Sequence, residues 1–114
     1  MKYQKDNIFA KILADEVPAK KVYEDEHVLA FHTIEPMADV HIIIIPKQPY
    51  IDYQDFVSRA DDAEVARFFR TVDKVAKEQK IDNSYKLITN FGEDSGQKVF
   101  HFHVHLLSGS IKTI

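Results

Sequence analysis

The chain has 114 residues, no cysteine, and 15 basic against 18 acidic side chains, a net charge of −3. This length suits one domain, residues 1–114, that buries roughly two-thirds of its unfolded surface. The charge balance and the lack of a basic cluster argue against nucleic-acid binding, and the lack of cysteine excludes disulfides and thiolate metal sites. No apolar run resembles a signal peptide or a membrane span, so we expect a cytoplasmic protein without membrane contact.

A short helix is predicted near the N-terminus, over residues 8–14. Asp6 or Asn7 can cap its first turn, and Pro18 stops the chain from continuing as helix, because the residue before a proline avoids helical backbone. Its apolar side chains gather on one face and predict packing against a core: Ile8, Phe9, Ile12 and Leu13.

Three strands are predicted next. Residues 21–24 and 28–32 form two strands joined by a polar turn. His32 ends the second strand and faces either the core or a pocket. After a loop, the β-branched run 41–45 predicts a central strand buried on both faces, with His41 at its mouth.

The second half begins with a connection, residues 49–56, that has room for one short helical turn. A long helix follows over about residues 61–80, capped by Ser58 or Asp61. Its predicted buried stripe consists of Val65, Phe68, Phe69, Val72, Val75 and Ala76. Residues 85–90 predict another strand. This order of elements predicts an α+β domain with a mainly antiparallel sheet.

His101, His103 and His105 alternate with apolar residues close to the C-terminus. The period-two pattern predicts a strand with an apolar core face and a histidine face. On a flat strand the outer two would lie about 14 Å apart at Cβ, too far for three rings to share one ion. We therefore expect separate roles, in which one ring attacks and its neighbours orient or donate. His41 is a candidate for the same site, and a metal bound by two neighbouring histidines stays an alternative.

The segment 101–107 resembles the His-x-His-x-His-x-x signature of the histidine triad family, in which x is apolar. The similarity extends over about residues 7–109 and is strongest to the phosphoramidase branch of that family. The other matching positions are residues 8–12, 17–20, 23–25 and 29–32, Pro36, His41, residues 45–47, Asn90, Gly92, Gly96, Gln97 and Val99.

This resemblance implies a five-stranded, mainly antiparallel sheet with two helices, and a homodimer formed through the long helix and a central strand. It also implies a nucleotidyl hydrolase or transferase that acts on a 5′-phosphate in an ester, anhydride or phosphoramidate. The expected substrate is a purine nucleotide or nucleoside phosphoramidate, cleaved through a covalent nucleotidyl-histidine intermediate. Neither a cofactor nor a metal is implied.

The resemblance further implies the roles of individual residues. His103 is the nucleophile, His105 assists the leaving group, and His101 and His41 support the site by hydrogen bonding and orientation. An apolar slot for the base is implied at Ile8, Phe9, Ile12, Phe31, His32 and Ile34, with Thr33 at the position that contacts the ribose. Phosphate-side contacts are implied at Asn90, Gly96, Gln97, Lys98 and Val99.

Three features depart from the phosphoramidase branch. Thr33 stands where that branch has an aspartate that binds the ribose hydroxyls, which predicts a weaker ribose contact. Lys98 replaces a serine near the phosphate, and it either favours a more anionic substrate or points outward. The tail 110–114 lacks the branch's tryptophan-proline segment.

Three other functions remain open from the sequence. The first is a dinucleoside polyphosphate hydrolase or nucleotidyl transferase of the same family. The second is a nucleotide-binding regulatory protein with incidental activity. The third is a zinc-binding protein that uses two triad histidines and His41.

Overall fold

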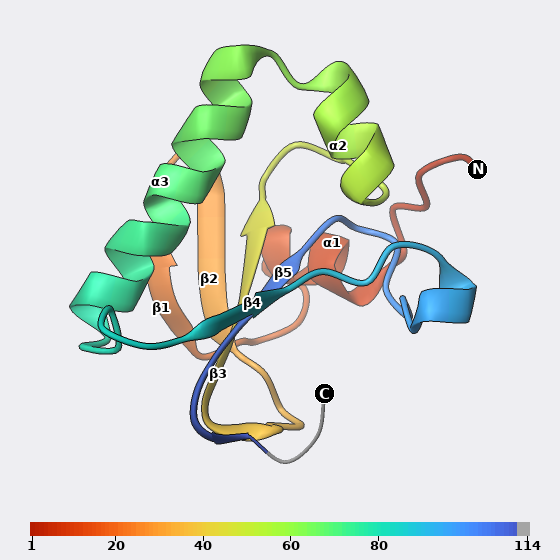
Figure 1. Ribbon diagram of the computed structural model, residues 1–114. Coiled ribbons are helices and arrows are strands. Elements are labelled where there is room, and N and C mark those ends of the chain that lie inside the picture. Colours follow the sequence, from red (N-terminus) through yellow and green to blue (C-terminus); the bar gives the residue numbers. More distant parts are fainter. Residues whose placement is uncertain (112–114) are drawn as a thin grey trace.

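The computed structural model describes residues 1–111 and is built around a five-stranded sheet (Figure 1). Across the sheet the strands are β1 (Lys21–Glu24), β2 (Val28–His32), β3 (Ala38–Pro46), β5 (Val104–Ile111) and β4 (Lys86–Ile88). Every pair of neighbouring strands is antiparallel. The predicted α+β class with a mainly antiparallel sheet is therefore confirmed.

One face of the sheet packs against α3 (Asp62–Glu78), which runs down the left side of Figure 1. Asp61 caps this helix by accepting a hydrogen bond from the backbone N–H of Glu64, as the sequence predicted. Phe68 is buried, but its neighbour Phe69 is 39% exposed, so the prediction that Phe69 belongs to the buried stripe is wrong. Consecutive helical residues point about 100° apart, which carries Phe69 past the edge of the core face.

The connection after β3 contains α2 (Tyr53–Arg59), longer than the single helical turn that the sequence suggested. Asp52 caps it by accepting from the N–H of Asp55. The buried ring of Phe56 stacks on Phe102, with centroids 4.6 Å apart. This contact ties α2 to the segment that precedes β5.

The opposite face of the sheet packs against α1 (Ile8–Leu13), which Asn7 caps through the N–H of Ala10. Phe9 and Ile12 are its buried residues, and they pack on side chains of β2 and β3: Leu29, Phe31, Ile43 and Ile45. His105 is directly opposite Ile43 in the β3–β5 ladder. Paired residues of neighbouring strands point to the same face, so His105 lies on the α1 side of the sheet.

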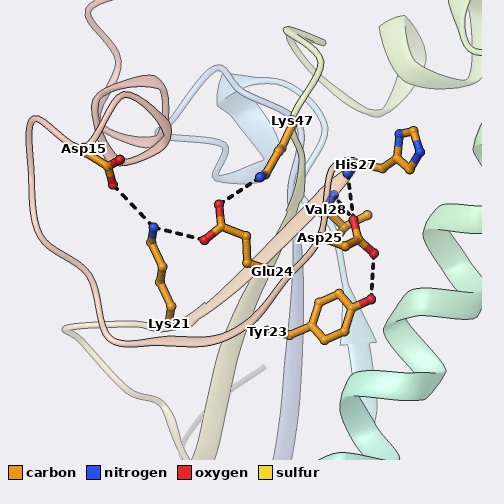
Figure 2. A network of polar contacts seen from close by, with 8 residues as sticks. All are labelled: Asp15, Lys21, Tyr23, Glu24, Asp25, His27, Val28 and Lys47. Carbon is orange, nitrogen blue, oxygen red and sulfur yellow. Dashed lines mark hydrogen bonds and ion pairs between the residues drawn. The ribbon is translucent and has the colours of Figure 1, made fainter.

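Figure 2 shows the polar contacts around the turn between β1 and β2. Asp25 Oδ1 accepts from the N–H groups of His27 and Val28, at 2.7 and 2.8 Å, which closes the turn. Glu24 forms ion pairs with Lys21 of its own strand and with Lys47 at the end of β3. The exposed pairs contribute little energy each, but the pair with Lys47 joins β1 to the residue that follows β3.

The strand boundaries differ from the predicted ones near the histidines. Strand β5 begins at Val104, so His101 and His103 precede it and the prediction of a single strand over the triad is wrong. The reason is a long-range contact, because the N–H of Phe102 donates to the carbonyl of Tyr50 at 2.7 Å instead of joining the ladder. Strand β3 begins at Ala38, which places His41 inside it rather than at its mouth.

The remaining segments are short. Strand β4 has three residues where the sequence predicted 85–90, and the loop after it contains the 3-10 helix η1 (Glu93–Ser95). Within residues 1–111, each helix is too short or too polar to cross a membrane. The tail that lacks the tryptophan-proline segment lies partly, at residues 112–114, outside the described range.

Alanine substitutions at two separate glycines, Gly109 and Gly92, test how tightly β5 is held against β3. Gly109 has φ +85°, and a Cβ there would come within 2.5 Å of the Asp39 carboxylate, whose Oδ2 accepts from the N–H of Ser110. Gly92 has a similar φ of +89°, but no described atom lies within 4 Å of its Cβ position. Gly92 has ψ 155°, a backbone region essentially restricted to glycine, so Gly92→Ala should cost about 1–3 kcal/mol of strain, and Gly109→Ala should cost more in urea denaturation. Equal losses would show that Asp39 moves aside freely.

Candidate active site

Three of the four predicted catalytic histidines form one cluster. The ring of His105 lies 5.1 Å from the ring of His103 and 5.1 Å from that of His41, measured between centroids. His103 and His41 are each 6% exposed, so these two rings of the cluster are buried. His101 lies apart and is fully buried.

The hydrogen bonds of His103 define which of its nitrogens is free. Its Nδ1 lies 2.7 Å from the backbone carbonyl oxygen of His101. A carbonyl can only accept, so Nδ1 carries the proton, and in the neutral ring Nε2 then holds a lone pair. Burial lowers the pKa of His103, which keeps the ring neutral near pH 7. A neutral imidazole with a free Nε2 is suited to nucleophilic attack.

The other two rings of the cluster form a directed pair. The backbone N–H of Met37 donates to His41 Nδ1 at 3.0 Å, so the proton of neutral His41 sits on Nε2. That nitrogen lies 2.9 Å from His105 Nδ1, which must accept. His105 therefore carries its proton on Nε2. Burial, helped by His103 and His41, lowers the pKa of His105 to about 4, and burial lowers the pKa of His41.

His101 is held at both ring nitrogens. Its Nε2 donates to the carbonyl of Pro46 at 2.7 Å, and its Nδ1 accepts from the hydroxyl of Tyr3 at 2.6 Å. Burial lowers the pKa of His101 to about 4, so the ring is neutral. It supports the site through its own backbone carbonyl, which receives the Nδ1–H of His103. Sequence reasoning missed Tyr3, because no pattern connects residue 3 with residue 101.

A cavity of about 700 Å³ opens between α1 and the strands β2 and β3. Phe9 lines it, and the Phe9 ring stands edge-on to the His103 ring with centroids 4.9 Å apart. The cavity therefore adjoins the nucleophilic histidine. Its other lining residues are Ile8, Ile12, Val17, Pro18, Ala19, Lys20, Phe31, His32, Thr33, Ile34 and Ile43. Together with Phe9, the lining includes all six residues predicted for the base slot and also Thr33, predicted for the ribose contact.

The predicted phosphate-side residues lie elsewhere, around the loop before the triad. Gln97 is buried, and its amide donates to the carbonyls of Ile51 and Val99 and accepts from the N–H of Gly92. Both of its hydrogens are thus used within the protein. The Asn90 amide donates to the carbonyl of Ser95. Both side chains hold the loop in shape.

The last three predicted positions also lie in this loop. Gly96 has φ +95°, and its Cβ position would lie 3.5 Å from the Asn90 amide. Lys98 and Val99 line a separate hollow beside the N-terminal residues, not the apolar cavity.

Most ring nitrogens of the four histidines already take part in hydrogen bonds and are therefore not free to bind a metal ion. Through residue 111, no group of three histidine, cysteine or carboxylate side chains is arranged to hold one. After the hydrogen bonds above, only His103 Nε2 and His105 Nε2 of the four rings are unused. A zinc site that included His41 would have to break its bond with Met37 or with His105.

Buried neutral histidines predict a pH-dependent stability. The pKa of His101 and of His105 is about 4 in the folded protein, against 6.5 without perturbation. Between these values the unfolded chain binds more protons than the native one, so the free energy of unfolding falls as the pH is lowered from about 6.5 to about 4. Urea denaturation across that range should show this fall, and His105→Gln should make it smaller. A wild-type profile that is flat in this window would contradict the assignment.

Comparison with known proteins agrees with this architecture. The family model described as HIT domain matches residues 14–111. A HIT-like protein of Rickettsia prowazekii is 51% identical over 94% of this chain and 90% of its own. The crystal structure of a HIT family hydrolase from Legionella pneumophila superposes with a TM-score of 0.86 at 36% identity, over 95% of this chain and 96% of that one. A histidine triad nucleotide-binding protein from Candida albicans gives 0.79 at 30% identity, over 89% and 73%. The chain belongs to the HIT domain family.

Proposed function

We propose that the protein is a nucleotidyl hydrolase that cleaves a purine nucleoside 5′-phosphoramidate through a covalent intermediate on His103. The observation that carries this proposal is the free Nε2 of a neutral, buried His103 beside an apolar cavity. Family membership supports it, since one relative is described as a hydrolase and another as nucleotide-binding. The absence of cysteine suits a cytoplasmic location.

The first chemical step is a displacement at phosphorus. The lone pair of His103 Nε2 forms a bond to phosphorus, and the phosphorus–nitrogen bond of the substrate breaks. The amine leaves with the electron pair of that bond and with one proton taken up from solvent. The ring of His105 lies 5.1 Å from that of His103, measured between centroids, and its Nε2–H stabilises the charge that develops on the departing atom.

The second step returns the enzyme to its starting state. Water attacks phosphorus, its oxygen forms the new bond, and the electron pair of the phosphorus–Nε2 bond returns to the ring. One proton goes back to solvent. While the ring is nucleotidylated it carries positive charge, and its Nδ1–H bond to the His101 carbonyl becomes charge-assisted. Two transfers thus consume one water molecule and release a nucleoside monophosphate.

The cavity supplies the site for the base. Its volume of about 700 Å³ and its largely apolar lining suit a flat purine held between side chains of α1 and β2. At its rim, the Thr33 hydroxyl accepts from the N–H of Glu35 and offers an uncharged contact for the ribose. Phosphate contacts are proposed at the loop around Gly96 and Lys98. Gln97 contributes there by holding the loop, because its amide hydrogens are already bound.

A homodimer is part of this proposal, but we place its contact at a sheet edge rather than at the long helix and a central strand that the resemblance implied, because each central strand already has a partner on both sides. Strand β4 ends the sheet, with β5 as its one partner in residues 1–111. Leu87 in β4 is 41% exposed, which leaves an apolar side chain at a sheet edge that can pair with a second copy.

A charge at this edge tests the dimer. Leu87→Arg should give a monomer in sedimentation velocity, because each copy would bring a positive charge into the apolar contact proposed at this edge. Val57→Arg is the matched control, since Val57 is equally exposed but lies on α2. A dimer that survives Leu87→Arg would place the interface elsewhere.

Substrate class is tested by steady-state hydrolysis of three adenosine 5′-monophosphate derivatives in EDTA. These are a phosphoramidate of a fluorescent amine, a diadenosine polyphosphate and a simple ester. The proposal predicts turnover of the phosphoramidate with chelator present. A preference for the polyphosphate would make Lys98 a specificity residue and the protein a dinucleoside polyphosphate hydrolase. Activity lost in EDTA would support a metal site, and binding without turnover would support a regulatory protein.

Removal of the nucleophile should abolish this activity. His103→Ala should lower kcat by at least about 1,000-fold, since no other free imidazole nitrogen in the cluster holds a lone pair. His27→Ala is the control, because His27 lies in the β1–β2 turn, where its Nε2 is 3.0 Å from the exposed carboxylate of Glu26. The melting temperature of each variant should be measured as well, since His103 is buried. Substantial turnover by a folded His103→Ala protein would exclude His103 as the nucleophile.

A further inference from the structure

The loop of residues 33–37 is attached to His41 at both of its ends. At one end the backbone N–H of Thr33 donates to the carbonyl oxygen of His41 at 3.3 Å. At the other end the backbone N–H of Met37 donates to His41 Nδ1 at 3.0 Å. Thr33 also lines the apolar cavity. One residue of the histidine cluster thus receives both ends of a loop that borders the cavity.

The contact with Met37 has only one possible direction. An amide N–H cannot accept a hydrogen bond, so a proton on His41 Nδ1 would face another N–H at 3.0 Å in a buried place. The proton is therefore excluded from Nδ1. The proton of neutral His41 is then on Nε2, which donates to His105 Nδ1 at 2.9 Å. Because His105 Nδ1 accepts this bond, the proton of neutral His105 is on its Nε2.

We infer that the backbone N–H of Met37 sets the hydrogen-bond direction of the His41–His105 pair and so makes His105 present an N–H, rather than a lone pair, to the atom that leaves phosphorus. Met37 is a positioning residue here, because it acts through His41 and does not touch the reacting atoms. This inference rests on the proposed nucleotidyl transfer.

The direction of the His41–His105 hydrogen bond affects how easily the leaving group departs from phosphorus. When the bond to phosphorus breaks, the leaving atom gains an electron pair and becomes a stronger acceptor. An N–H facing it stabilises that change, whereas a lone pair on His105 Nε2 would repel it. The benefit is greater for a basic leaving group, such as an alkylamine, than for a nitrophenolate, which leaves readily unaided. The N–H of Met37 therefore helps the enzyme to cleave substrates that have poor leaving groups.

A proline tests the amide directly. Met37→Pro removes the N–H, and Met37→Leu changes the side chain while the N–H remains. Both are compared with wild type on two substrates that share one nucleoside, an alkylamine phosphoramidate and a nitrophenyl ester. The proline variant should lose about 10- to 100-fold in kcat on the phosphoramidate, with KM nearly unchanged, and should keep most of its rate on the ester. The leucine variant should keep the wild-type ratio of the two rates. Equal losses on both substrates would overturn the inference, because they would indicate a general structural effect.

NMR spectroscopy of the wild-type protein tests the inferred proton positions even if the proline variant does not fold. Long-range ¹H–¹⁵N spectra of the free wild-type protein distinguish the two nitrogens of each histidine. The inference requires the protonated nitrogen to be Nε2 in both His41 and His105, and a proton on His41 Nδ1 would overturn it. This measurement needs no substrate, so it stands apart from the test of the hydrolase function. In a folded Met37→Pro protein the His41 signals should show Nδ1 protonation that is absent from the leucine variant.

Discussion

The site depends on backbone groups that fix the direction of the histidine hydrogen bonds. Carbonyl oxygens of His101 and Pro46 and the N–H of Met37 each permit one role only, donor or acceptor. They thereby assign a proton to one nitrogen of every ring. The result is a lone pair at His103 and an N–H at His105, with centroids 5.1 Å apart. Neutral rings are required for this order, and burial supplies them by lowering each histidine pKa.

The two faces of the sheet have different roles: one holds the larger hydrophobic core, and the other holds the candidate active site. The face toward α3 contains the larger core, in which Phe56, Phe68 and Phe102 pack together. The face toward α1 is covered over β2 and β3 by a short helix, and the cavity opens there beside the histidine cluster. Phe102 belongs to the first face, while its neighbours His101 and His103 serve the second. Packing of Phe102 thus anchors the segment that carries the nucleophile.

Local patterns in the sequence predicted much of this arrangement. The β-branched run of β3 is buried as expected, and Asn7 and Asp61 cap their helices by the contacts that their side chains favour. The base-slot residues, taken from the family resemblance, do line one cavity. Separate roles for the histidines, expected from spacing on a strand, agree with their separate hydrogen bonds, although only His105 is in β5.

Several features that escaped prediction depend on contacts between residues that are distant in the sequence. The start of β5 is set by Phe102 and Tyr50, and the ring of His101 is held by Tyr3. Gln97 was expected to contact the phosphate, but its side-chain amide donates hydrogen bonds to the carbonyls of Ile51 and Val99. Periodicity describes which face a residue occupies, but it says nothing of the partner that a polar group finds across the fold.

The most direct test of the account is to identify the residue that carries the nucleotidyl group during turnover. The protein would be mixed with excess adenosine 5′-phosphoramidate, stopped within the first turnovers in alkaline denaturant, digested, and analysed by mass spectrometry. The account predicts an adenosine monophosphate adduct on His103 and on no other histidine. An adduct on His105 or His41, or rapid turnover with no adduct at any residue, would contradict the assignment of His103 as the nucleophile.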